Sequence, residues 1–195
     1  MAYYKDINNY VVVKSSKIQD FGAATGNSDN FTEIQAAIDA DYRVVFLGEV
    51  GETYTISQPL YLKSNKTYII NGTIVIKNGS TANLTANISA GANSFTVDSV
   101  TNFAVGEWIS VTDDNALQLY ATYRGWSGRI TGITDLTITL DNVSPYNYTT
   151  AANGRIGHTQ GVIYMPQKSN ILIDGYGIFD GNRYNQSQFH PVLVS

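Results

Sequence analysis

The sequence predicts an all-β protein, built as a coiled solenoid of short strands with one helix and one inserted β-rich module. Charged residues make up 14% of the 195 residues, against roughly 25% in an ordinary soluble domain. Uncharged polar residues take their place, with 18 Asn, 19 Thr and 15 Ser. Short apolar runs alternate with Asn-Gly and Asp-Gly pairs, which are typical of turns between strands.

The one helix is expected at about residues 30–40, after a loop rich in turn-forming residues. Asn30 and Glu33 have the spacing of a capping box, in which each side chain satisfies a backbone N–H of the first turn. The apolar residues of this segment recur on one side of a helix. They are Ile34, Ala37 and Ile38.

Short strands are expected on both sides of this helix, because apolar residues alternate or run together between turn signals. The expected strands lie at 10–13, 43–47, 52–56, 59–62, 67–70 and 73–76. The Asn71-Gly72 pair between the last two is compatible with a hairpin. It is equally compatible with a corner whose residues need a positive φ.

An internal repeat indicates that these strands form a solenoid. Lys63-Ser64-Asn65 precedes one strand and Lys168-Ser169-Asn170 precedes another, 105 positions later. The 78 residues at 80–157 have a different pattern, and without them the repeat is 27 residues long, about one turn of a β-solenoid. Repeats of 20–50 residues are typical of stacked structural units.

The inserted segment is predicted to be a small β-barrel or sandwich-like module of antiparallel strands. Its expected strands lie at 93–98, 103–112, 128–133 and 136–141. The predicted organisation is a lead-in at 1–19, a capping helix with the first solenoid turns at 20–79, the inserted module at 80–157, and further solenoid turns at 158–195.

Composition argues against several classes of function. The net charge is −4, and the 12 Lys and Arg are scattered, whereas nucleic-acid binding needs a basic footprint. No apolar stretch reaches the roughly 18 residues of a membrane helix, so no membrane insertion is expected. The absence of cysteine removes disulfides and zinc–thiolate sites, and we expect neither a cofactor nor a metal. The polar N-terminus lacks the pattern of a secretory signal.

The segments Asp20-Phe21-Gly22-Ala23 and Phe31–Asp39 resemble the opening of the pectate-lyase-like right-handed parallel β-helix superfamily. Gly51–Ser57 and Asn170–Gly175 resemble later parts of its turns. The resemblance implies a right-handed parallel β-helix whose helix caps the open first turn. The chain departs from the family pattern in lacking a Gly-Asp-Gly run after Gly26 and in carrying the long insertion.

This superfamily contains pectate lyases, polygalacturonases and bacteriophage tailspikes. The absence of a signal sequence favours a virion structural protein, a tailspike or tail appendage that contributes to recognition of host-surface glycans. The resemblance then implies a homotrimer, contacts with other virion tail proteins and with bacterial surface polysaccharide, and assembly in the host cytoplasm. The alternative is a secreted polysaccharide lyase or glycoside hydrolase. Since only about three turns fit into 195 residues, the chain is expected to be the N-terminal part of a longer protein.

Acidic residues are the first candidates for catalysis, because glycoside hydrolysis needs two carboxyl groups at a defined separation. Asp174 and Asp180 are the candidates on a predicted turn of the solenoid. Each precedes a glycine, so turn geometry is the favoured explanation. We therefore expect no catalytic site within these residues, although a longer chain could cleave polysaccharide. Asp113-Asp114 is interpreted as a solvated loop, with calcium binding as the alternative.

Histidines and aromatic residues are the remaining candidates. His158 and His190 are interpreted as loop residues, because no pattern of a catalytic triad surrounds them. An aromatic cluster in the insertion supplies the candidates for glycan binding, since exposed rings can stack on sugars. These candidates are Tyr120, Tyr123 and Trp126. The favoured interpretation is that such rings pack the core of the module or a subunit contact.

Overall fold

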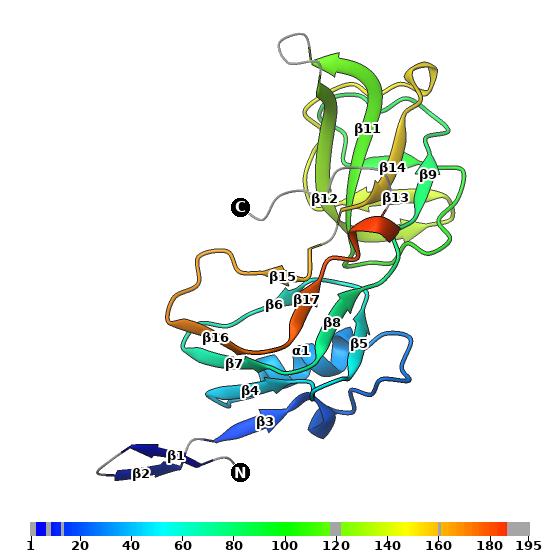
Figure 1. Cartoon of the computed structure of the whole chain (residues 1–195). Coiled ribbons are helices and arrows are strands. Elements are labelled where there is room, and N and C mark those ends of the chain that lie inside the picture. The colour runs from blue at the N-terminus through cyan, green and yellow to red at the C-terminus, as the bar shows by residue number, and fades with distance from the viewer. Residues whose placement is uncertain (1–2, 7–8, 13, 118–121, 160, 187–195) are drawn as a thin grey trace. The chain divides into compact units, whose positions relative to one another are not determined.

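The computed structural model describes residues 3–6, 9–12, 14–117, 122–159 and 161–186 of this chain (Figure 1). The chain divides into two compact units. The parallel unit comprises Met1–Lys77 and Gly161–Asn182, and the antiparallel unit comprises Asn78–Gln160 and Arg183–Ser195.

Three parallel sheets form most of the parallel unit. The first has the order β16-β7-β4-β3, formed by Ile171–Gly175, Lys66–Ile70, Val44–Leu47 and Ser15–Lys17. The second has the order β17-β8-β5, formed by Ile178–Asp180, Thr73–Ile76 and Thr53–Ile56. The third pairs β15 (Ile163–Tyr164) with β6 (Leu60–Tyr61). The remaining elements are an antiparallel hairpin of β1 (Tyr3–Asp6) and β2 (Asn9–Val12) and the 3₁₀ helix η1 (Ile18–Phe21).

The sheets show how the chain turns between consecutive strands. β7 and β8 flank Asn71-Gly72 but lie in different sheets, so this pair forms a corner and not a hairpin. Ile171 pairs with Lys66 in the first sheet, and Ile178 pairs with Thr73 in the second. Both partners are 105 positions apart, so the predicted internal repeat is confirmed. We call each set of consecutive strands, one from each sheet, a rung.

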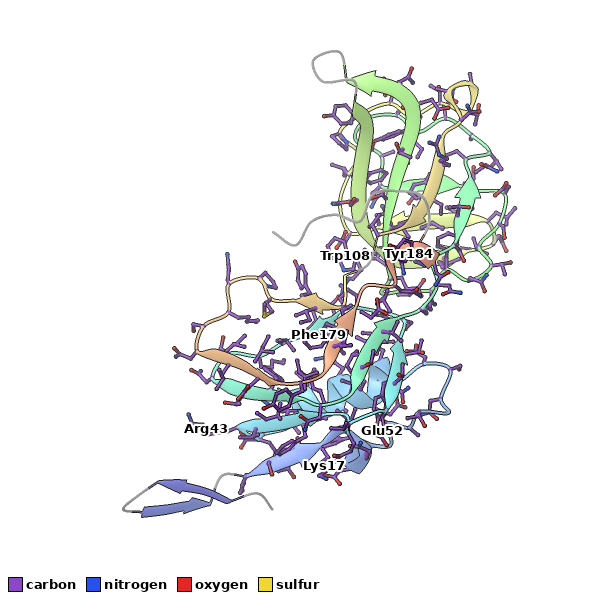
Figure 2. All side chains as sticks on the ribbon, in the orientation of Figure 1. Lys17, Arg43, Glu52, Trp108, Phe179 and Tyr184 are labelled. Atoms are coloured by element: carbon purple, nitrogen blue, oxygen red, sulfur yellow. The ribbon has the colours of Figure 1, made fainter. Side chains whose placement is uncertain are left out.

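Alternate side chains of the rungs form the core of this unit. Ser16, Val45, Tyr68 and Ile173 follow one another across the first sheet. Val45 and Tyr68 are fully buried, whereas Ile173 is 39% exposed. In the second sheet Phe179 of β17, labelled in Figure 2, follows the buried Ile74. Apolar residues at alternate positions of neighbouring strands therefore stack into ladders.

The helix α1 (Phe31–Asp39) confirms the one helix expected from the sequence, and it buries Ile34, Ala37 and Ile38 against the same core. The predicted capping box is wrong. Asn30 Oδ1 accepts hydrogen bonds within the preceding loop, from Ala24 N and Asn27 Nδ2. Asp29 Oδ1 instead accepts the N–H of Phe31, at 3.0 Å, together with that of Ser57. A tertiary contact thus decides which side chain satisfies the first turn.

Lys66 satisfies the other end of the helix. Its Nζ donates to the carbonyl oxygens of Ile38, at 2.6 Å, and Ala40. A cation beside the last carbonyls is favourable because these groups carry the negative end of the helix dipole. Burial lowers the pKa of the Lys66 ammonium.

The antiparallel unit is a half-barrel with strand order β10-β13-β12-β11-β14-β9. These strands span, in chain order, β9 Thr81–Asn83, β10 Ser94–Thr96, β11 Trp108–Leu117, β12 Thr122–Thr134, β13 Thr137–Leu140 and β14 Arg155–His158. Two 3₁₀ helices, η2 (Thr150–Ala152) and η3 (Arg183–Asn185), complete it. Its core includes Val111, Ile130 and Ile156, all fully buried.

The described residues are therefore mostly β with one α-helix, as predicted, and the insertion is antiparallel. No helix within the described ranges is long and apolar enough to cross a membrane.

Candidate functional site

A cleft of about 380 Å³ opens on the parallel unit beside α1. The helix supplies one wall, and two successive rungs supply the other, at the corners that follow β6 and β15. The lining residues are Gln35, Asp39, Tyr61, Leu62, Lys63, Tyr164, Pro166 and Lys168. We call this site the helix cleft.

Unequal corner lengths characterise the rung side of the helix cleft. Tyr164 pairs with Tyr61 in the two-stranded sheet, and Ser169 N donates to Ser64 Oγ where the next strands begin. One residue separates Tyr61 from Lys63, whereas three separate Tyr164 from Lys168. The two extra residues include Gln167, which has a left-handed φ of 53°. The longer corner therefore has to bulge, and its residues line the cleft.

Gln35 ties the helix wall to the first of these rungs. Its Oε1 accepts the N–H of Tyr61 at 2.9 Å, and its Nε2 donates to the Tyr61 carbonyl oxygen at 3.2 Å. The same Nε2 donates to Asp39 Oδ1. The amide thus uses both of its ends to fix the edge of β6 and to orient the carboxylate of Asp39.

Two tyrosines from successive rungs meet in the helix cleft. The rings of Tyr61 and Tyr164 meet edge to face, with their centroids 5.4 Å apart. Tyr164 is 38% exposed. Tyr61 Oη is shielded from solvent, and within the described part of the chain no group hydrogen-bonds to it. The cleft therefore offers an accessible aromatic surface and a buried hydroxyl that lacks a partner.

Lys63 and Lys168 give the helix cleft an excess of positive charge. Lys63 Nζ lies 2.9 Å from Asp39 Oδ1, and both side chains are about half exposed. Lys168 is exposed in the corner that precedes β16. Two cations thus face one carboxylate, although the whole chain carries a net charge of −4. The lining contains one carboxylate, whereas glycoside hydrolysis uses a pair.

Asp174 and Asp180, the candidates for catalysis, do not line this cleft. Asp174 lies on β16 and Asp180 ends β17, and both are exposed. Asp174 Oδ1 accepts the N–H of Gly175 at 2.8 Å, and Asp180 Oδ1 accepts that of Asn182 at 2.7 Å. Hydrogen bonds of this kind stabilise turns.

The aromatic candidates for glycan binding lie in the antiparallel unit. Trp126 is 4% exposed, packs edge to face against Phe95, and donates from Nε1 to Asn142 Oδ1 at 2.8 Å. Trp126 is therefore part of the core of this unit, and its ring is not exposed to a ligand. Tyr123 belongs to β12, where its backbone pairs with Ala116. The side chain of Tyr123 and all of Tyr120 lie outside the described residues.

The interpretation of Asp113-Asp114 as a solvated loop is wrong, because both residues belong to β11. Asp113 is fully buried and accepts hydrogen bonds from Asn115. Asp114 accepts from Asn153 Nδ2 at 2.6 Å and pairs with Arg155 at 2.7 Å, and these two contacts, in that order, lower the pKa of its carboxyl. In the described ranges no three metal-ligating side chains gather.

The interpretation of His158 as a loop residue is also wrong. It ends β14, is 1% exposed, and its ring stacks on Phe103 with the centroids 4.6 Å apart. Its Nε2 lies 2.8 Å from Oε2 of the buried Glu107. Its Nδ1 accepts the N–H of Ser80, so the proton of the neutral ring resides on Nε2 and is directed at the carboxylate. His190 lies outside the described residues.

Comparison with known proteins found no matching family model and no matching curated protein. Solved structures do match. Tailspike gp61 of Pseudomonas phage phi297 matches with a TM-score of 0.43 and 15% identity over 87% of this chain and 36% of its own. This match and the two that follow are bacteriophage tailspikes.

The second tailspike is Gp54 of Acinetobacter baumannii bacteriophage AP22, solved in complex with A. baumannii capsular saccharide. It has a TM-score of 0.40 and 12% identity over 86% of this chain and 34% of its own. Tailspike gp49 from Pseudomonas phage LKA1 has a TM-score of 0.35 and 14% identity over 82% of this chain and 34% of its own. This chain therefore spans about a third of the length of the tailspikes that it matches.

The residues of the helix cleft were not among the candidates from the sequence. The signal that could have identified them is the internal repeat, because a tyrosine precedes the Lys-Ser-Asn segment both at Tyr61 and at Tyr164. Neither the bulge between Tyr164 and Lys168 nor the position of α1 beside it is visible in that pattern.

Proposed function

We propose that the parallel unit is the beginning of a right-handed parallel β-helix, and that the chain is a virion structural protein, a tailspike or tail appendage that contributes to attachment to host-surface glycans. The observation that carries the proposal is the common 105-residue offset by which β16 and β17 pair with β7 and β8 in two different sheets. A constant offset in several sheets is what successive coils of one solenoid produce.

The position of α1 supports this proposal. The helix buries its apolar side in the core of the parallel unit and follows the Asp20-Phe21-Gly22-Ala23 segment that resembles the opening of the superfamily. A capping element prevents the first strands of a solenoid from pairing with other chains. The combination of motif, helix and parallel rungs therefore supports the proposal of a β-helix start.

Apolar side chains on the third rung support a subunit interface. Leu172 is 56% exposed, Ile178 is 58% exposed, and Tyr176 between them is 96% exposed. Exposed apolar patches mark sites of protein–protein contact. We propose a homotrimer that also contacts other virion tail proteins and is assembled in the host cytoplasm.

Two measurements on the purified chain test these proposals. Native mass spectrometry is expected to show a trimer, and a monomer at every concentration would contradict the proposed assembly. Capsular polysaccharides from a panel of bacteria, immobilised on a biosensor, are expected to include at least one that the chain binds. The release of new reducing ends or unsaturated sugars from such a polysaccharide would instead support the alternative, a lyase or hydrolase.

A further inference from the structure

We propose that the helix cleft binds an acidic sugar residue of a surface polysaccharide. The sugar carboxylate lies between Lys63 and Lys168, and one face of the sugar packs on the ring of Tyr164. This inference rests on the proposed glycan-binding function and names both the site and the class of ligand.

Charge is the first argument. Lys63 and Lys168 occupy the same position of the internal repeat on successive rungs, and both line the helix cleft. Asp39 neutralises only Lys63. A carboxylate bound between the two ammonium groups would accept hydrogen bonds from both.

The carbohydrate character of the ligand follows from the other lining residues. A small inorganic anion would use the lysines alone, whereas the cleft also contains an exposed tyrosine ring and the exposed ring of Pro166. Tyrosine offers an apolar face beside a polar hydroxyl, as a sugar ring offers C–H faces beside hydroxyl groups. The volume of about 380 Å³ lies within the range of small-molecule sites.

Tyr61 provides a further argument for a polyhydroxylated ligand. Tyr61 lines the cleft, and its hydroxyl is shielded from solvent and has no hydrogen-bond partner within the described part of the chain. A buried hydroxyl without a partner is unfavourable. A sugar hydroxyl that reaches Tyr61 Oη while the sugar ring packs on Tyr164 would satisfy it.

The test uses tetragalacturonate as the acidic probe and its methyl ester as the matched neutral probe. We expect isothermal titration calorimetry of the full chain to show binding of the acid, about fivefold weaker binding of the ester, and weaker binding of the acid at high salt. Equal affinity for acid and ester, or no binding of the acid at about 10 mM, would overturn the proposal.

Variants of the chain locate the site. Lys168→Gln is expected to weaken binding of tetragalacturonate about fivefold, and Tyr164→Ala about tenfold. Lys14→Gln makes the same change of charge at an exposed residue outside the cleft and is expected to leave the affinity unchanged. Thermal unfolding checks that each variant is folded, and Lys168→Glu offers a second surface substitution. If the cleft variants bind as the wild type does, the site is wrong.

The biosensor panel separates failure of this inference from failure of the proposed function. A chain that binds a capsular polysaccharide but neither loses that binding in Tyr164→Ala nor binds tetragalacturonate would overturn the inference alone. A chain that binds no polysaccharide of the panel would overturn the glycan-binding function as well.

Discussion

Asn170 Nδ2 donates a hydrogen bond of 2.9 Å to Asn65 Oδ1, although the two residues are 105 positions apart. Both have a left-handed backbone, with φ of 54° and 62°, which asparagine tolerates better than most residues. The two residues thus form a short ladder at equivalent corners of successive rungs. The side chain and the backbone conformation together explain why asparagine recurs there.

Replacement of Asn170 tests this ladder. We expect Asn170→Ala to lower the free energy of unfolding by about 2 kcal/mol, because it removes the hydrogen bond and places an alanine in the left-handed region. Asn170→Gly loses the same hydrogen bond without the backbone strain, so its loss should be smaller. Urea denaturation followed by circular dichroism measures both, and equal losses would show that the backbone contributes nothing.

Substitution of Gly175 tests how closely the second and third rungs approach each other. A Cβ at this position would lie 2.1 Å from the carbonyl oxygen of Ile70, and its φ is +112°. Gly175→Ala is therefore expected to cost about 3 kcal/mol or more, since contact and conformation both oppose it. Gly181→Ala is the matched control, because a Cβ there meets nothing within 4 Å. Similar unfolding midpoints for the two variants would contradict the described pairing of β16 with β7.

The buried pair of His158 and Glu107 is expected to stabilise the antiparallel unit. Glu107→Leu leaves His158 Nε2–H without its buried acceptor, so we expect a loss of about 3 kcal/mol. Glu107→Gln keeps an oxygen that can accept the same hydrogen bond and should cost less than half as much. Chemical denaturation monitored by tryptophan fluorescence compares them. A larger loss for the glutamine variant would argue against this hydrogen bond as the main contribution.

Tyr54 predicts a loss of stability at alkaline pH. Its side chain is 1% exposed, and burial, followed by the hydrogen bond to Glu52, raises its pKa from 10.0 to about 12. Figure 2 labels Glu52 on the same unit. Because the folded state holds the proton more tightly than the unfolded state, this contribution is complete below pH 10 and disappears as the pH rises to about 12.

The variant Tyr54→Phe isolates this contribution from those of the other tyrosines. We expect the wild type to exceed the variant in free energy of unfolding by about 2 kcal/mol at pH 8, where the hydrogen bond to the carboxylate is intact. The difference should shrink between pH 10 and 12. Urea unfolding at a series of pH values measures it, and a constant difference up to pH 12 would be inconsistent with the raised pKa.

Much of the fold could be predicted because local patterns and tertiary packing agree. The repeat of Lys-Ser-Asn predicts the stacking of corners, and the apolar stripe predicts α1. The strands β9 and β14 could not be predicted, since their short sequences, Thr81–Asn83 and Arg155–His158, lack an apolar run. The prediction of a capping box was wrong because Asp29 and Asn30 are both suitable helix caps. Only the contact of Asp29 with Ser57 decides which of the two side chains caps α1.

The candidate site could be predicted less well than the fold. The helix cleft combines α1 with corners from two rungs, and one of these corners follows the inserted module. Local sequence identifies the tyrosines and lysines but not the difference in length between their corners. The sequence pointed instead to the aromatic cluster of the insertion as a glycan-binding site. Trp126 shows why such clusters are ambiguous, because an aromatic ring that could bind a sugar can equally fill a core.

The pairing of Ser80 with His158 bears on the order in which the chain folds. The strands Thr73–Ile76 and Ile163–Tyr164 are separated by residues 77–162, and closing so long a flexible loop costs entropy. His158 N donates to Ser80 O, and Ser80 N donates to His158 Nδ1, so the antiparallel unit joins its own two ends. Once it has folded, only a few residues at each end remain to be closed, which lowers the entropic cost by about 2 kcal/mol. We therefore expect the insertion to fold early and to speed the docking of the third rung onto the second.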